Sequence, residues 1–240
     1  NNWGTEVQLV HKPRIILNSF LRGGPRWRYS EENIFTFSVG TDQSKKFNVG
    51  LGFANSVAKQ DNFKFRRYEL NLNYQPFDAL SVSLNTAYTE NPNRTQYVDQ
   101  QDFNGTTRYI LGEIDNQSLS TTLRLNYSIN PNLSIQYYGQ PFVARGRYNN
   151  FNFVNNSLVK DLNERVSWYD DNQVSIANNI YSIDENLDGN VDYQFENPDF
   201  SVVQFRSNLV MRWEYIPGSE LFFVWSKGTS GDGIISNSLT

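Results

Sequence analysis

The chain has 240 residues, a formal net charge of −4 and no cysteine. The length favours one domain, the charge argues against a general nucleic-acid surface, and the missing cysteines exclude disulfides and thiolate metal sites. Aromatic residues make up 15% of the chain, yet no run approaches the roughly 20 apolar residues that a membrane-spanning helix needs.

Alternation of apolar and polar residues predicts nine β-strands. Their approximate ranges are 5–20, 27–39, 46–58, 62–75, 79–89, 106–129, 133–148, 201–215 and 220–229. Lipid on one side of a strand and a polar lumen on the other produce this alternation with an aromatic-rich apolar face. The pattern therefore predicts an all-β fold, an antiparallel up-and-down transmembrane β-barrel, while a soluble all-β protein is the alternative.

The same alternation predicts which side chains face lipid. The lipid-facing set is Leu119, Leu123, Leu125, Leu209, Met211, Trp213 and Phe223. The inward-facing set is Arg124, Arg206, Arg212 and Glu214. A basic residue facing the middle of the bilayer costs about 2–4 kcal/mol, so we expect this register not to slip by one residue.

The predicted connections alternate between short and long. Short ones lie at 40–45, 76–78, 130–132 and 217–219, and long ones at 90–105 and 149–200. Short turns at one rim and long extracellular loops at the other are typical of outer-membrane barrels. Because bacterial single-chain barrels have an even number of strands, a count of nine suggests that residues 1–240 form an incomplete barrel.

The connection at 149–200 is long enough to be functional or to fold by itself. It holds ten acidic and two basic residues, a net charge of −8, which leaves +4 for the rest of the chain. We expect this acidic segment to be extracellular.

Residues 184–192 of this loop have the ligand spacing of a calcium loop. The candidate ligands are Asp184, Asn186, Asp188, Asn190 through its carbonyl, and Asp192, with Gly189 permitting the turn. The twelfth position is Phe195 instead of the bidentate Glu of an EF-hand. Calcium is one interpretation, and an Asx-rich turn without a metal is the other.

Signals of catalysis are weak. The single histidine, His11, has no partner motif, and no serine nucleophile elbow is present. We therefore expect no enzymatic activity and no catalytic residue.

In the segment 137–142, Pro141 cannot donate a ladder hydrogen bond, which predicts a bulge or strand break. Its aromatic neighbours suit a membrane-interface belt or a sugar-stacking surface.

An ordered series of motifs resembles a known family. It comprises 137–142, Ile183-Asp184, Asp188-Gly189, 197–200, 205–208, 212–215 and 217–219. The series is similar to the C-terminal barrel of uncharacterised Gram-negative outer-membrane proteins, in which a carbohydrate-binding module resembling family nine precedes the barrel. The resemblance implies a location in the bacterial outer membrane at the cell surface, and it assigns no catalytic residue.

Three functions follow as expectations. The first is a barrel for transport or docking within an outer-membrane assembly. The alternative is the membrane anchor of a glycan-binding surface protein, and an outer-membrane hydrolase is a third. The expected partners are outer-membrane lipid, other outer-membrane proteins and a glycan, and the expected cofactor is calcium.

Overall fold

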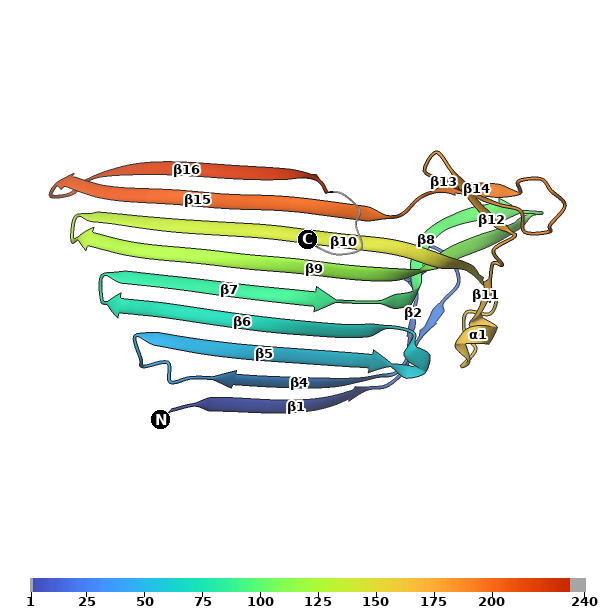
Figure 1. Ribbon diagram of the computed structural model, residues 1–240, viewed down its shortest axis with the longest axis horizontal. Helices are drawn as coiled ribbons and strands as arrows, with labels where there is room; N and C mark the ends of the chain where they lie inside the picture. Colours follow the sequence, from blue (N-terminus) through green and yellow to red (C-terminus); the bar gives the residue numbers. More distant parts are fainter. Residues whose placement is uncertain (1, 234–240) are drawn as a thin grey trace.

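The computed structural model describes residues 2–233, and most of them lie in one antiparallel sheet (Figure 1). Nine long strands follow each other across it, and each neighbouring pair is antiparallel. In order they are β1 (Gly4–Lys12), β4 (Glu32–Gly40), β5 (Phe47–Ala58), β6 (Lys64–Phe77), β7 (Leu80–Glu90), β9 (Thr106–Asn130), β10 (Leu133–Val154), β15 (Phe200–Ile216) and β16 (Ser219–Asp232). The predicted all-β antiparallel fold and its nine sequential strands are confirmed.

The two predicted strands nearest the N-terminus are shorter in the structure than the sequence pattern indicated. The strand at 5–20 ends at Lys12, and the strand at 27–39 is divided before Glu32. Pro13 lacks the N–H that would continue the ladder beyond the Lys12–Glu32 pair. The remaining segments, β2 (Ile15–Leu17) and β3 (Trp27–Tyr29), pair with each other in a separate hairpin.

The connections are sorted between the two ends of the sheet, as predicted. The turns after β4, β6, β9 and β15 lie at one end, on the left of Figure 1, which we name the turn end. The β2–β3 hairpin and the long segment after β10 lie at the opposite loop end. One loop-end connection is short, the 3₁₀ turn η1 (Lys59–Asp61) between β5 and β6.

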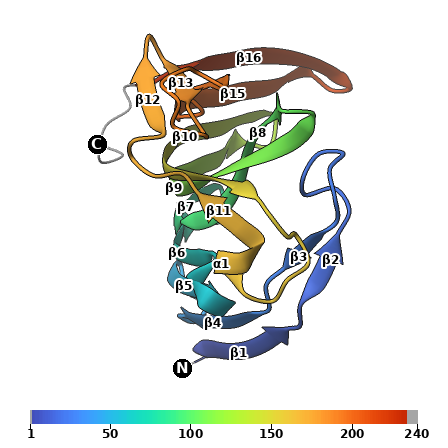
Figure 2. The same ribbon diagram turned by 90° about the vertical axis from the view of Figure 1, so that its right-hand side faces the viewer.

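Both predicted long loops contain secondary structure that the sequence pattern did not reveal. The first holds β8 (Asn93–Phe103), which pairs with β9. The second starts later than predicted, because β10 continues to Val154. It contains α1 (Leu162–Arg165), β11 (Val166–Trp168), β12 (Val174–Ala177), β13 (Ile180–Ile183) and β14 (Tyr193–Glu196). We name the assembly of β8, the adjoining halves of β9 and β10, and these later elements the cap (Figure 2).

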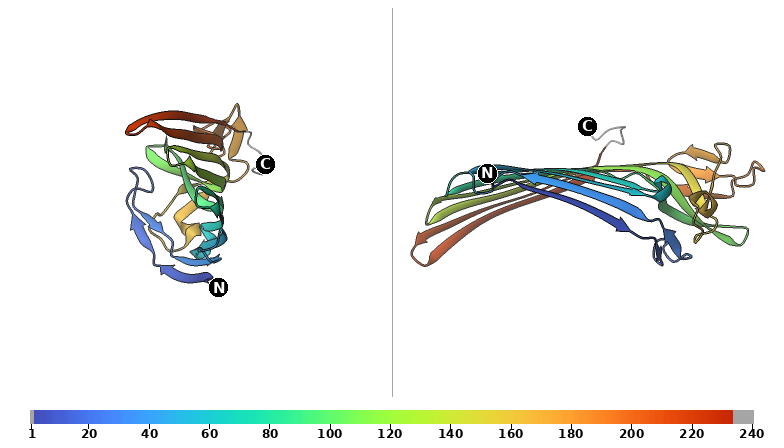
Figure 3. Two further views of the ribbon diagram at one scale, coloured as in Figure 1. Left: turned by 90° about the vertical axis from the view of Figure 1, so that its left-hand side faces the viewer. Right: turned by 90° about the horizontal axis from the view of Figure 1, so that it is seen from below.

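The cap holds two hydrophobic clusters, on opposite faces of β9. Ile110 is fully buried in one, with aromatic residues from β10, β13 and β14. Leu111, the next residue, is fully buried in the other, against Leu21 and Trp27 of the β2–β3 segment. Adjacent residues of a strand point to opposite faces, so this part of β9 is covered on both sides. The rest of the sheet extends away from the cap as a curved layer (Figure 3).

The prediction of a bulge or strand break at Pro141 is wrong. β10 runs through it, and Pro141 lies opposite Phe205 of β15. Pairing with β9 skips Gln140 and Pro141 and resumes at Phe142 in the same register. The missing N–H of Pro141 therefore interrupts the pairing of β10 only locally and only with β9. The register shifts in this pairing lie elsewhere, at 133–134 and 149–152.

No helix among residues 2–233 is both long enough and apolar enough to cross a membrane.

Candidate functional site

Apolar side chains line up across the sheet in one continuous face. Strand pairing places Val49 opposite Leu72, Leu72 opposite Leu84, and Leu84 opposite Leu123. The same face continues through Leu125, Tyr137, Leu209 and Trp225 on the following strands. Many of these side chains are exposed, Leu51 by 50% and Phe223 by 52%. We name this surface the apolar face.

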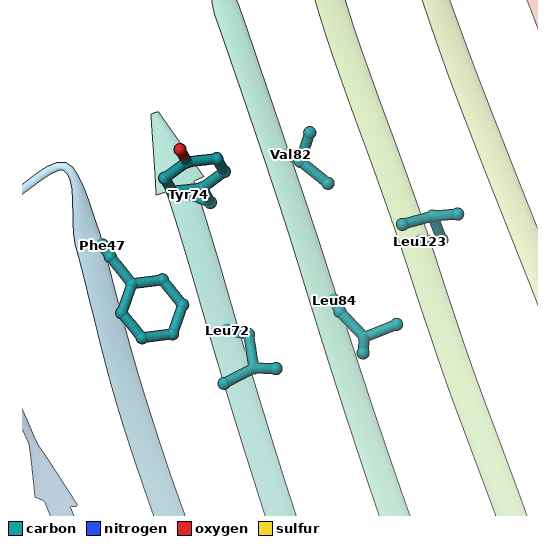
Figure 4. Close-up of a pocket in the computed structure, with 6 residues that line it drawn as sticks. All are labelled: Phe47, Leu72, Tyr74, Val82, Leu84 and Leu123. Carbon is teal, nitrogen blue, oxygen red and sulfur yellow. The ribbon is translucent and has the colours of Figure 1, made fainter. Parts of the chain in front are cut away.

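A shallow apolar depression lies on this face towards its turn end (Figure 4). Six side chains from four neighbouring strands surround it, and five of them are pure hydrocarbon. They are Phe47, Leu72, Tyr74, Val82, Leu84 and Leu123. Almost no polar group is present to orient a ligand. The depression is therefore part of an apolar surface and lacks the convergent polar groups of a specific binding pocket.

Aromatic side chains border the apolar face in two rows. The turn-side row contains Phe47, Tyr74, Phe77, Tyr127, Trp213 and Tyr215, which contact in pairs with ring centroids 6.0–6.4 Å apart. The loop-side row contains Phe35, Phe53, Tyr68 and Tyr88, with consecutive centroids 6.2, 5.3 and 6.3 Å apart. Tyr68 and Tyr74 belong to the same strand, six residues apart, which at about 3.4 Å per residue separates the rows by about 20 Å.

Charged and polar groups begin immediately beyond the loop-side row. Glu90 accepts a hydrogen bond from the Tyr88 hydroxyl at 3.1 Å and pairs with Arg66 at 3.6 Å. In the next strands Gln117 and Arg145 continue this level, and Arg145 reaches Asp115 at 3.3 Å. The apolar face therefore ends sharply at the loop-side row.

The opposite face of the sheet is polar, which agrees with the predicted sorting of side chains. Arg124, Arg206, Arg212 and Glu214 all alternate with members of the apolar face. Arg67 pairs with Glu69 at 2.5 Å, and Arg212 pairs with Glu220. That this polar face points into a lumen, and the apolar face to lipid, stays a prediction.

The structure places the five predicted calcium ligands in one exposed loop between β13 and β14. The side-chain oxygens of four of them accept hydrogen bonds from the loop's own backbone. The Asp184 carboxylate accepts from the N–H groups of Asp188 (3.1 Å) and Gly189 (2.8 Å). Asp192 accepts from Glu185 N–H at 2.7 Å. These are the contacts of an Asx-rich turn.

Asp188 shows the same behaviour. It accepts from the Asn190 N–H at 2.9 Å, and this hydrogen bond lowers the pKa of the Asp188 carboxyl. Asn186 in turn accepts from the Asp188 N–H at 2.9 Å. Among residues 2–233 no three His, Cys, Asp or Glu side chains gather as a metal-binding group. Calcium binding by this loop stays a prediction.

Calcium titrated into the protein should release heat that Asp188→Ala abolishes. A cation would have to displace these backbone contacts and take water as further ligands, so we expect weak affinity, about 0.1–1 mM. Asp171→Ala removes an exposed acid from the same connection and should bind like the wild type. Equal heats from both variants, or none from the wild type, would leave an ordinary acidic turn.

A polar network holds β12–β14 against the β8–β9 hairpin. Arg108 of β9 binds the Glu185 carboxylate with both Nε (3.0 Å) and Nη2 (2.7 Å). Tyr193 donates to Glu185 at 2.5 Å, and the Tyr169 hydroxyl lies 2.9 Å from that of Tyr193. Because Arg108 and Glu185 are 77 residues apart, no local sequence pattern indicates this network.

Burial raises the pKa of both Tyr169 and Tyr193, and the hydrogen bond to Glu185 raises that of Tyr193 further. A raised folded-state pKa stabilises the fold below the ordinary tyrosine pKa of about 10, and this contribution is lost as pH rises above it. The free energy of unfolding of the cap should therefore fall above pH 10.

Tyr193→Phe should make this alkaline fall shallower, because one of the two titrating hydroxyls is gone. Tyr215→Phe, a change on an exposed ring, should leave it unaltered. Urea unfolding at a series of pH values measures both. Identical alkaline slopes for Tyr193→Phe and the wild type would contradict the assignment.

Comparison with known proteins gives one match, to a family model described as a domain of unknown function, DUF5916, over residues 20–234. No curated protein and no solved structure matches the chain. The match ends two residues beyond β16 and includes the whole cap.

Proposed function

Since the chain belongs to the DUF5916 family, whose function is unknown, we propose from its surfaces that it forms the wall of an outer-membrane β-barrel. The observation that carries the proposal is the apolar face between its two aromatic rows. The rows are about 20 Å apart along the strands, which at the usual tilt of about 35–45° corresponds to a height of about 15 Å, so the face between them lies within the apolar band of about 25 Å that aromatic girdles flank in such barrels.

The strand lengths agree with this function. A tilted strand crosses the bilayer in about 9–11 residues, and each of the nine long strands has at least 9 residues. Exposed apolar residues on this scale would be unfavourable in water, whereas in lipid they are in their preferred solvent. The sharp change to Arg66, Glu90 and Arg145 beyond the loop-side row supplies a water boundary.

The sorting of connections gives the proposed barrel an orientation. Short turns are periplasmic and long loops extracellular in outer-membrane barrels, so the cap lies outside the cell. The polar face, with Arg67, Glu69 and Arg124, then lines the lumen. A polar lumen beneath a folded extracellular cap suits transport or docking within an outer-membrane assembly.

A pair of neighbouring labels tests the assignment of faces. Because the chain has no cysteine, Leu84→Cys and Asn85→Cys each carry a single fluorophore on β7, on opposite faces of the sheet. With the protein in lipid vesicles, a quencher attached to the lipid tails should quench the label at 84 strongly and the label at 85 weakly. A water-soluble quencher should show the reverse order.

Equal quenching at the two positions by the lipid-borne quencher would overturn the proposal, because a membrane wall must separate its faces. Protein that stays free of the vesicles would also overturn it.

A further inference from the structure

A cleft at the loop end gathers positive charge from four separate parts of the chain. Its lining residues come from β3 and the segments next to β2 and β3, from η1, and from α1 with the residues before it. β2, β3 and α1 lie at the same end of the sheet (Figure 2). Its lining residues are Arg14, Arg28, Ser30, Glu31, Lys59, Gln60, Lys160 and Arg165. Five cations therefore face one carboxylate, in a chain whose overall charge is negative.

Most of this charge is uncompensated within the described residues. Lys59 pairs with Glu31 at 2.7 Å. Across residues 2–233, no ion pair involves Arg14, Arg28, Lys160 or Arg165. Of the acidic residues in the connection after β10, Asp161 offsets part of the charge of Arg165 without forming an ion pair with it.

The excess positive charge is energetically most unfavourable at Arg165, because only 1% of this residue is exposed to solvent. Its guanidinium donates to the Arg28 carbonyl and to Ser30 Oγ at 3.2 Å, while its Nε is buried without a hydrogen-bond partner. Burial, and then the neighbouring Arg28, lower the pKa of Arg165 to about 10. A buried cation without an ion-pair partner is unfavourable. The charge of Asp161 offsets this only in part, since the pKa of Arg165 stays lowered, and a bound anion would relieve it.

The cleft is also held in a fixed shape. Gln60, with a left-handed φ of 59°, accepts a hydrogen bond from the Leu162 N–H at 2.9 Å, which ties η1 to α1. The Arg28 N–H donates to the Ser157 carbonyl at 2.9 Å and ties β3 to the segment before α1. The backbone segments that carry Arg28, Lys59 and Arg165 are therefore held together before any ligand arrives, which reduces the entropy cost of binding.

We propose that this cleft binds a phosphate-type anion, either free inorganic phosphate or the phosphate of a lipid headgroup. Arginine side chains bind phosphate oxygens with paired, charge-assisted hydrogen bonds, and lysines add point charges. The enclosed part of the cleft is small, so one or two phosphate oxygens enter it while the remainder of the ligand stays at the opening. This inference does not depend on the proposed membrane location.

Two double variants with the same loss of charge test the site. Arg14→Gln with Lys160→Gln removes two exposed cations from the cleft without touching buried Arg165. Lys45→Gln with Lys46→Gln removes two exposed cations at the turn end. In neutral detergent micelles, calorimetric titration of inorganic phosphate should give a Kd for the cleft variant at least about tenfold above that of the wild type. The turn-end variant should bind as the wild type does.

A second titration separates the two sources of phosphate. Micelles containing short-chain phosphatidic acid should displace inorganic phosphate if the site accepts a lipid headgroup. If phosphatidic acid occupies the site at concentrations about tenfold lower than those at which inorganic phosphate does, the site is assigned to a lipid headgroup. If inorganic phosphate needs the lower concentration, the site is assigned to the free anion. No binding of either probe, or equal weakening by both double variants, would overturn the proposal.

Discussion

Replacing Leu72 with arginine should prevent stable insertion of the protein into lipid vesicles, while the same replacement of Asn71 should be tolerated. The two residues are neighbours on β6, and strand pairing puts Leu72 between Val49 and Leu84 on the apolar face. A guanidinium near the middle of the bilayer costs about 2–4 kcal/mol. That is a large part of the stability of a typical domain, whereas Asn71 lies on the polar face beside Gly50 and Asn85.

The comparison is matched because both variants add the same charge to the same strand. Folding into vesicles can be followed by protease protection and by urea titration of the inserted protein. Similar stability for Leu72→Arg and Asn71→Arg would show that the two faces meet the same solvent. That outcome would remove the basis for a membrane wall.

Glu185→Leu should release the β12–β14 sheet from the rest of the cap, at a cost of about 3 kcal/mol. Breaking one partner of a buried pair costs about 3–5 kcal/mol, and the low end applies because the Arg108 side chain keeps 22% exposure. The change leaves Arg108 and the Tyr193 hydroxyl without their common acceptor. Faster amide exchange should appear in β12–β14 and not in β5–β7.

Glu196→Leu provides the control, since it removes an exposed carboxylate from β14 that makes no ion pair among the described residues. We expect its free energy of unfolding to stay within about 0.5 kcal/mol of the wild type. If the Glu196 variant loses as much stability as the Glu185 variant, the loss comes from charge or propensity and the network has no special role.

The long strands could be predicted from sequence because the alternation of apolar and polar residues is a local signal. In β9, leucines alternate with serine, threonine and arginine over residues 118–125, and both the strand and its facing follow from period two. The turns at 130–132 and 217–219 carry proline, asparagine or glycine, which fixed where strands reverse.

The cap could not be predicted in the same way. β8 reads as a polar loop because Gln96, Asp99 and Gln101 interrupt its apolar residues, and its pairing with β9 makes it a strand. β11 to β14 have only three or four residues each, too few to show a period. The cationic cleft combines residues as distant as Arg14 and Arg165, so only the folded chain brings it together.

The direction in which each strand runs has a consequence for how a ring could close. Eight antiparallel steps connect β1 to β16, so the two outer strands point the same way. A seam made by joining them directly would be parallel. A ring with antiparallel neighbours throughout requires an odd number of strands between β16 and β1, which makes the total even. The number of strands therefore decides the hydrogen bonding at the seam. If these nine strands close alone, the hydrogen bonds there are of the slanted parallel type, and if an odd number of further strands joins them, they are of the perpendicular antiparallel type.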